Sequence, residues 1–183
     1  MKYFKKIPGE RVYLSPVNLE DLEIYTKWLN DREISDRLGD GCLMINLETE
    51  KRWIEEALKN GDQSYAIVLN ETDELLGNIG LFELKQIYGT ATLGLFIGEE
   101  EKRGKGYGTE ALKLMVGYAF DVLNLRNIML NVYEFNENAY KSYIKAGFKE
   151  MGRRRGAYYV DNKYHDVIYM DITREDWYSS DMK

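Results

Sequence analysis

The segment Glu99-Glu100-Glu101-Lys102-Arg103-Gly104-Lys105-Gly106-Tyr107-Gly108-Thr109-Glu110-Ala111-Leu112 decides the fold, because glycines at alternate positions join a strand-like stretch to a helix-like one. Before it, residues 92–98 are apolar and short, as in a buried strand. After it, apolar residues recur at helical spacing (Leu112, Met115, Val116, Ala119, Phe120 and Leu123). Such a loop can direct backbone N–H groups at an anion, with the helix dipole behind them. The sequence therefore predicts a phosphate-binding loop.

Two other phosphate loops do not fit this segment. A Walker A loop needs four residues between its first glycine and Gly-Lys-Ser/Thr, but five residues lie between Gly98 and Gly104, and Gly106 follows the lysine. A dinucleotide fingerprint opens the first βαβ unit, and here the third glycine comes one position early and past the middle of the chain. A purely structural glycine turn stays open as an alternative.

The loop resembles the acyl-CoA pyrophosphate loop of the GCN5-related N-acetyltransferases (GNAT), Q/R-x-x-G-x-G/A, with Arg103, Gly106 and Gly108 in the defining places. A second family motif, N-x-x-A-x-x-x-Y-x-x-x-G-F, is complete between Asn136 and Phe148. Residues 162–170 resemble the last strand of the branch that holds ribosomal-protein N-terminal acetyltransferases and spermidine acetyltransferases. The resemblance runs from about Tyr13 to Trp177, and it implies an acetyl-CoA-dependent N-acetyltransferase.

Length and composition favour one compact domain. The chain has 183 residues, 44% of them hydrophobic, and only two prolines. We expect a single acetyltransferase domain over residues 1–183, with a core at about 10–174, and a cytoplasmic location because residues 1–6 lack the apolar core of a signal peptide. One cysteine, Cys42, and one histidine, His165, cannot form a Cys/His zinc site, and no metal is expected.

The charge of the chain is negative and uneven. The net charge of −6 argues against a nucleic-acid partner, and no membrane partner is expected. The segment between Pro16 and Gly61 contains eleven acidic residues and six basic ones. This segment predicts either helix faces that are simply solvated or an acidic rim that attracts a polyamine or a basic peptide.

The periodicity predicts an α/β fold in the order β-α-α-β-β-β-α-β-α-β-β, with a mixed sheet and helices on both of its faces. The predicted strands are Arg11–Leu14, Ser64–Asn70, Leu75–Leu84, Thr90–Gly98, a strand around Leu130, and a closing hairpin that turns near Asp161-Asn162. Besides the two helices of the motifs, one helix is capped by Asn18 and carries Leu22, Tyr25, Trp28 and Leu29, and another spans about Glu48 to Asn60 and ends before Gly61.

The resemblance also implies how acetyl-CoA is bound. The loop residues Arg103, Gly104, Lys105, Gly106, Tyr107, Gly108 and Thr109 hold the pyrophosphate. Backbone groups of Phe96, Ile97 and Gly98 pair with the pantetheine where the strands around Phe96 and Leu130 splay apart, and the Ile97 amide is the candidate oxyanion partner. Asn136, Asn138 and Tyr143 meet the cofactor from the next helix. Seven residues span about 10 Å and nearly two turns, so Asn136 and Tyr143 share a face.

Tyr143 is the candidate general acid, because a phenol with a pKa of about 10 is protonated at neutral pH and can donate to the departing sulfur. The general base is less obvious. Relatives carry a glutamate in an A-E-x-G pattern where this chain has Thr92, and Glu83 is the expected substitute because it matches a strand carboxylate of the spermidine enzymes. Glu83 and Glu33 are also candidates for binding the ammonium group of the substrate.

Three functions remain open. The first is an N-acetyltransferase acting on a primary amine, either a polyamine or a protein N-terminus. The second is a non-catalytic acyl-CoA-binding regulator, for which Thr92 in place of glutamate is the argument. The third is an aminoglycoside-type small-amine acetyltransferase. The resemblance further implies a homo-oligomer, a dimer or larger.

Overall fold

The computed structural model describes residues 1–60 and 63–179. The strands are β1 Ile7–Pro8, β2 Val12–Pro16, β3 Gln63–Leu69, β4 Leu75–Lys85, β5 Thr90–Ile97, β6 Asn127–Tyr133, β7 Lys149–Val160 and β8 Lys163–Thr173. The α-helices are α1 Leu22–Leu29, α2 Arg32–Leu38, α3 Leu47–Asn60, α4 Tyr107–Asp121, α5 Glu137–Lys145 and α6 Arg174–Ser179. Within the described ranges, no helix is long and apolar enough to cross a bilayer.

The strands form one mixed sheet in the order β1-β2-β3-β4-β5-β6-β8-β7. Antiparallel pairs join β1 to β2, β2 to β3, β3 to β4, β6 to β8 and β8 to β7. The parallel register of β5 with β6 pairs Thr90–Thr92 with Asn127–Met129. The predicted α/β class and mixed sheet are confirmed.

The chain divides into two compact units. The first comprises residues 1–81 and 94–115, and the second comprises residues 82–93 together with the chain from residue 116 onward. The strands β4 and β5 and the helix α4 therefore each contribute to both units. Neither unit is a continuous piece of chain, and the single domain predicted from the sequence stays a prediction.

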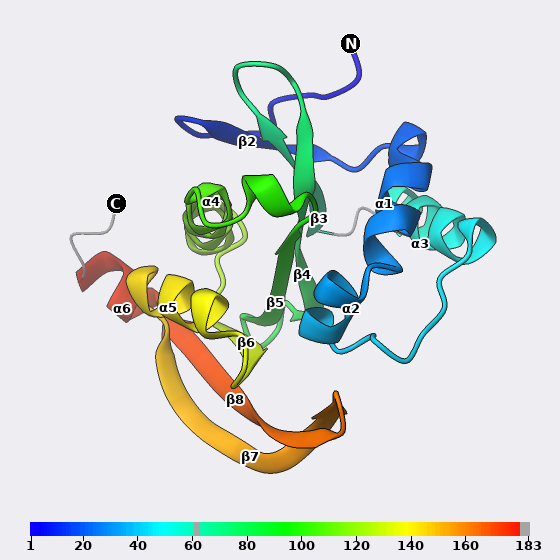
Figure 1. Cartoon of the computed structure of the whole chain (residues 1–183). Coiled ribbons are helices and arrows are strands. Elements are labelled where there is room, and N and C mark those ends of the chain that lie inside the picture. The colour runs from blue at the N-terminus through cyan, green and yellow to red at the C-terminus, as the bar shows by residue number, and fades with distance from the viewer. Residues whose placement is uncertain (61–62, 180–183) are drawn as a thin grey trace. The chain divides into compact units, whose positions relative to one another are not determined.

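In the first unit the helices α1, α2 and α3 lie together (Figure 1) and share an apolar core. Its buried members are Val17, Tyr25, Trp28, Ile34, Ile54 and Ala57, and Phe96 of β5 packs against them. The rings of Tyr25, Trp28 and Phe96 contact one another edge to face, with centroids 5.9 to 6.4 Å apart. This aromatic cluster packs α1 against the end of β5, where the glycine loop begins.

The early helices differ from the prediction. Asn18 caps a 3-10 turn, Leu19–Asp21, and α1 begins only after that turn. The helix α2 was not predicted. It starts where the Asp31 side chain accepts from the Glu33 amide and ends at Gly39, whose φ is +93°. Seven residues with few apolar positions are too short for periodicity to reveal a helix. The predicted end of α3 at Gly61 lies outside the described residues.

In the second unit β7 and β8 form a long curved ribbon (Figure 1). Its turn at Asp161-Asn162, where both residues have positive φ, confirms the predicted hairpin. The strand β7 is an edge of the sheet, and Arg153, Arg154 and Arg155 are exposed along it.

Three shorter features also differ from the prediction. The strand β1 and the helix α6 were not predicted. The helix α4 ends at Asp121, so Leu123 lies beyond it, and Leu125 is buried in its place. The other predicted members of the apolar face of α4 are buried, namely Leu112, Met115, Val116, Ala119 and Phe120.

Candidate active site

The glycine loop has the strand, turn and helix that the sequence predicts. It leaves β5 at Gly98, passes a short 3-10 turn and enters α4 at Tyr107. Gly104 and Gly106 have φ values of +70° and +87°, which residues with a Cβ adopt only at a cost in energy. The first amides of α4 have no partners within the helix, and the positive end of its dipole faces the loop. The loop can therefore accept an anion.

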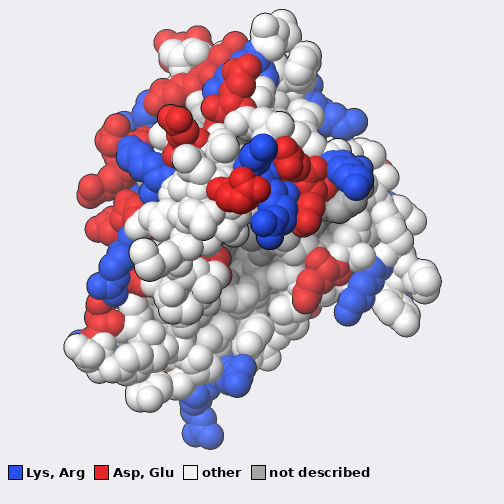
Figure 2. All heavy atoms as spheres, turned by 90° about the vertical axis from the view of Figure 1, so that its right-hand side faces the viewer, with Lys and Arg blue, Asp and Glu red and all other residues white. Residues whose placement is uncertain are grey.

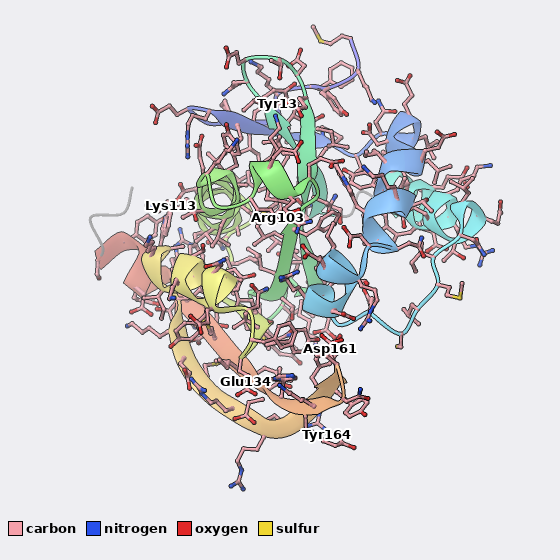
Figure 3. The ribbon with its side chains drawn as sticks, in the orientation of Figure 1. Tyr13, Arg103, Lys113, Glu134, Asp161 and Tyr164 are labelled. Atoms are coloured by element: carbon pink, nitrogen blue, oxygen red, sulfur yellow. The ribbon has the colours of Figure 1, made fainter. Side chains whose placement is uncertain are left out.

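The Arg103 guanidinium turns back onto the end of β5 (Figure 3). Its Nε donates to the Ile97 carbonyl at 3.1 Å and its Nη2 to the Gly98 carbonyl at 2.6 Å. Its Nη1 pairs with Glu33 of α2 at 2.9 Å. Arg103 was predicted to bind the cofactor and Glu33 to bind the substrate. The structure pairs their side chains with each other.

Arg11, the residue just before β2, supports the loop and was not predicted as a site residue. Its Nη1 donates to the Lys105 carbonyl at 2.9 Å, and its guanidinium lies 5.2 Å from the centre of the Tyr107 ring. Glu110 of α4 holds Arg11 in place, because its carboxylate accepts from Nε at 2.9 Å and from the Arg11 amide at 2.7 Å. It also accepts from the Val12 amide at 3.2 Å. The loop thus has beside it a guanidinium that is ion-paired with Glu110.

Glu99 ties the start of the loop to α1. Its Oε1 accepts from the Trp28 indole N–H and from Lys27 Nζ, both at 2.9 Å. The hydrogen bonds from Lys27 and then Trp28 lower the pKa of the Glu99 carboxyl. Glu99 is therefore ionised at neutral pH and anchors the loop to the aromatic cluster.

The backbone N–H groups at the end of β5 point to opposite edges of the strand. The Gly98 amide donates to the Leu76 carbonyl of β4 at 2.8 Å. Because successive residues of a strand direct their N–H groups to opposite edges, the Ile97 amide faces away from β4. The predicted oxyanion partner thus lies on the other edge of β5, while the Gly98 amide already has a partner. The predicted separation of the strands near Phe96 and Leu130 stays a prediction.

Gly98→Ala tests the packing that supports the loop. A Cβ at residue 98 would lie 2.5 Å from Trp28 Cζ2, which forces the indole to move, so we expect the free energy of unfolding to fall by about 2 kcal/mol. Urea unfolding followed by circular dichroism measures this. Gly152→Ala is the control, because nothing lies within 4 Å of its added Cβ, and its stability should change by less than about 0.5 kcal/mol. Equal effects of the two substitutions would contradict the proposed clash.

The helix α5 carries the other predicted cofactor contacts. Asn136 caps it, with its side-chain oxygen accepting from the Ala139 amide at 3.4 Å, and Asn138 is exposed in its first turn. Tyr143 is buried on the same helix, 6.1 Å from the Phe148 ring. Burial raises the pKa of the Tyr143 phenol to about 12. Tyr143 is therefore protonated throughout the neutral range, as a general acid must be.

The remaining predicted site residues lie as follows. Glu83 is exposed on β4, and its Oε2 accepts a hydrogen bond from Thr92 of β5. Tyr107, Gly108 and Thr109 form the first turn of α4. A Cβ at Gly108 would lie 3.4 Å from Leu95, so the helix packs closely on β5 there. His165 faces Glu134 at 3.1 Å, and Cys42 is exposed.

Comparison with known proteins gives three kinds of match. A model of the acetyltransferase (GNAT) domain matches residues 11–149. The spermidine N(1)-acetyltransferase of Escherichia coli (strain K12) is 35% identical over 112 residues, 61% of this chain and 60% of that protein. The protein YdaF of Bacillus subtilis (strain 168), whose name proposes ribosomal N-acetyltransferase activity, is 32% identical over 103 residues, 56% of each protein.

A solved structure shows the same fold. The spermidine N-acetyltransferase of Vibrio cholerae, in complex with CoA and spermine, superposes with a TM-score of 0.84 at 22% identity. The match covers 93% of this chain and 99% of that one.

Proposed function

Because this chain belongs to the GNAT family of N-acetyltransferases, which are acyltransferases, we propose that it transfers an acetyl group from acetyl-CoA to a primary amine, with a polyamine as the first candidate acceptor. The observation that carries the proposal is the glycine loop. It has left-handed glycines at 104 and 106, a helix N-terminus behind it and the Arg11 guanidinium beside it. These are the features that bind a diphosphate.

The polyamine proposal is supported by the acidic segment of the first unit and by the spermidine acetyltransferases among the relatives. Figure 2 shows acidic and basic side chains mixed on the face of the molecule that it draws. Several acids of α2 and α3 are neutralised by neighbours, as in the Arg32–Asp36 and Lys51–Glu55 pairs. Ion pairing thus accounts for part of the acidic surface, and only acids without such neighbours remain to bind a cation.

A protein N-terminus is the second candidate acceptor, supported by the likeness to YdaF. Both acceptors present a primary ammonium group with a pKa above neutrality, and both need the same chemistry. The resemblance also supports a homo-oligomer.

In the proposed mechanism Glu83 takes a proton from the ammonium group, and the free amine nitrogen attacks the thioester carbonyl carbon. The Ile97 amide donates to the oxygen that becomes negative. The C–S bond then breaks, and Tyr143 donates its phenolic proton to the departing thiolate. Arg103 is not assigned to the chemistry, because its guanidinium is bonded to the Ile97 and Gly98 carbonyls and to Glu33.

A thiol-release screen tests the proposal. Purified protein is supplied with acetyl-CoA and with spermidine, spermine, peptides with free N-termini, or aminoglycosides, and free thiol is measured. We expect turnover with at least one polyamine. Turnover with peptides alone would select the second acceptor, and turnover with aminoglycosides alone would reject both. Binding of acetyl-CoA in calorimetry without turnover for any amine would instead support a non-catalytic regulator.

A further inference from the structure

A side-chain hydrogen bond links the candidate base to the strand beside it. Thr92 Oγ1 of β5 donates to Glu83 Oε2 of β4 at 3.1 Å. The two residues lie in the same compact unit, nine positions apart, on either side of the turn at residues 86–89. Thr92 is also held by the parallel register of β5 with β6, in which it pairs with Met129. The donor therefore sits on a fixed part of the sheet.

The backbone of Glu83 is strained. Its φ is +49°, in the left-handed region, although Glu83 is not glycine and lies within the range of β4. A residue with a Cβ adopts this conformation at a cost of about 1 to 2 kcal/mol, and it persists only where the surroundings impose it. Such an irregularity in a strand re-aims a side chain. Here the re-aimed side chain is the one that reaches Thr92.

We propose that Thr92 is a positioning residue, which holds the Glu83 carboxylate in the orientation that accepts the proton of the acceptor amine. The proposal rests on the function proposed above. An exposed glutamate without a partner samples many rotamers, and fixing one of them costs side-chain entropy. A hydroxyl donor on a neighbouring strand offsets that cost and leaves Glu83 Oε1 for the substrate. Thr92 thus has a role of its own where relatives carry glutamate.

The test compares Thr92→Val, which keeps the shape and removes the hydroxyl, with Thr92→Ser, which keeps the hydroxyl. We expect Thr92→Val to lower kcat by about 10-fold, since misplacing a reacting group carries a penalty of that order or more. Acetyl-CoA affinity, measured by calorimetry, should be unchanged. Thr92→Ser should keep kcat within about 3-fold of the parent. The matched control is Thr90→Val, two residues earlier on β5, which should leave kcat unchanged.

A double-mutant cycle separates positioning from a general packing effect. In a Glu83→Gln background, Thr92→Val should lower kcat no further, because the group that Thr92 orients is already absent. Equal losses from Thr92→Val in both backgrounds, or a loss in Thr92→Ser as large as in Thr92→Val, would overturn the positioning role. These outcomes leave the acetyltransferase proposal standing, whereas that proposal fails if the parent protein has no turnover with any amine.

Discussion

Tyr143→Phe is expected to lower turnover by about 100-fold or more while acetyl-CoA affinity stays nearly intact, because the substitution removes only the phenolic proton of the candidate acid. The ring is buried against Phe148, and phenylalanine fills the same space. Burial raises the pKa of Tyr143 to about 12, so the proton is available across the usual assay range. Steady-state kinetics with the acceptor found in the screen, together with calorimetry of acetyl-CoA, measure the two quantities.

Tyr140→Phe is the control for this prediction. It makes the same change on the same helix and removes a hydrogen bond from the Tyr140 hydroxyl to Glu150 at 3.2 Å. Its turnover should stay within about 3-fold of the parent, since the lost bond is exposed. Unchanged turnover in Tyr143→Phe would remove Tyr143 from the mechanism, and an equal loss of acetyl-CoA affinity would make it a binding residue.

The second large effect concerns Glu50, a buried carboxyl on α3. Its side chain is 4% exposed, and Oε1 has no hydrogen-bond partner. Asp21 Oδ2 of the same unit is likewise buried without a hydrogen-bond partner. Burial raises the pKa of Glu50 from 4.5 to about 7. The folded protein therefore holds this proton more tightly than the unfolded chain does.

The sign of the pH effect follows from this difference. The stability that the bound proton contributes is fully present below pH 4.5 and is lost as the pH rises through about 7, a total of about 3 kcal/mol at most. Glu50→Gln carries no titrating group, so its stability should lack this decline. At pH 8 we expect it to exceed the parent in free energy of unfolding by about 2 to 3 kcal/mol.

Urea unfolding at pH 5 and pH 8 checks the Glu50 prediction. Glu55→Gln is the control, because it neutralises an exposed carboxylate on the same helix, one that pairs with Lys51 at 3.7 Å. Its stability should change by less than about 0.5 kcal/mol at either pH. A Glu50→Gln protein that is no more stable than the parent at pH 8 would contradict this prediction. It would show that the Glu50 carboxylate is stabilised by solvent or by a partner.

The regular elements could be predicted because each leaves a local pattern. The strands β3, β4 and β5 follow one another with turn residues between them, and α4 repeats its apolar positions over four turns. The short helix α2 could not be predicted, since two apolar residues in seven give no period. Its caps, Asp31 and Gly39, were the signals in the sequence that could have revealed it.

The contacts that hold the loop could not be predicted from the sequence. Arg11 and Glu110 are 99 residues apart, and Trp28 and Glu99 are 71 apart. Nothing local distinguishes Arg11 from other surface arginines, because its role depends on where β2 lies relative to α4. The motif located the loop itself, because glycines at fixed spacing mark positions where the backbone is left-handed or must approach a ligand closely. The hydrogen bond between Thr92 and Glu83 was missed for another reason: strand alternation does not anticipate a left-handed residue inside β4.

The two ends of the sheet bear on how the protein behaves at high concentration. An open strand edge is a template on which another chain can add, and repeated addition leads to aggregates. At one end β1 has only two residues, one of them Pro8, which has no N–H to offer. At the other end β7 is long. Arg153 is paired with Glu150 there, but the exposed Arg154 and Arg155 would bring like charges together if two such edges met. Each edge thus resists open-ended growth by its own means, shortness in one case and electrostatic repulsion in the other.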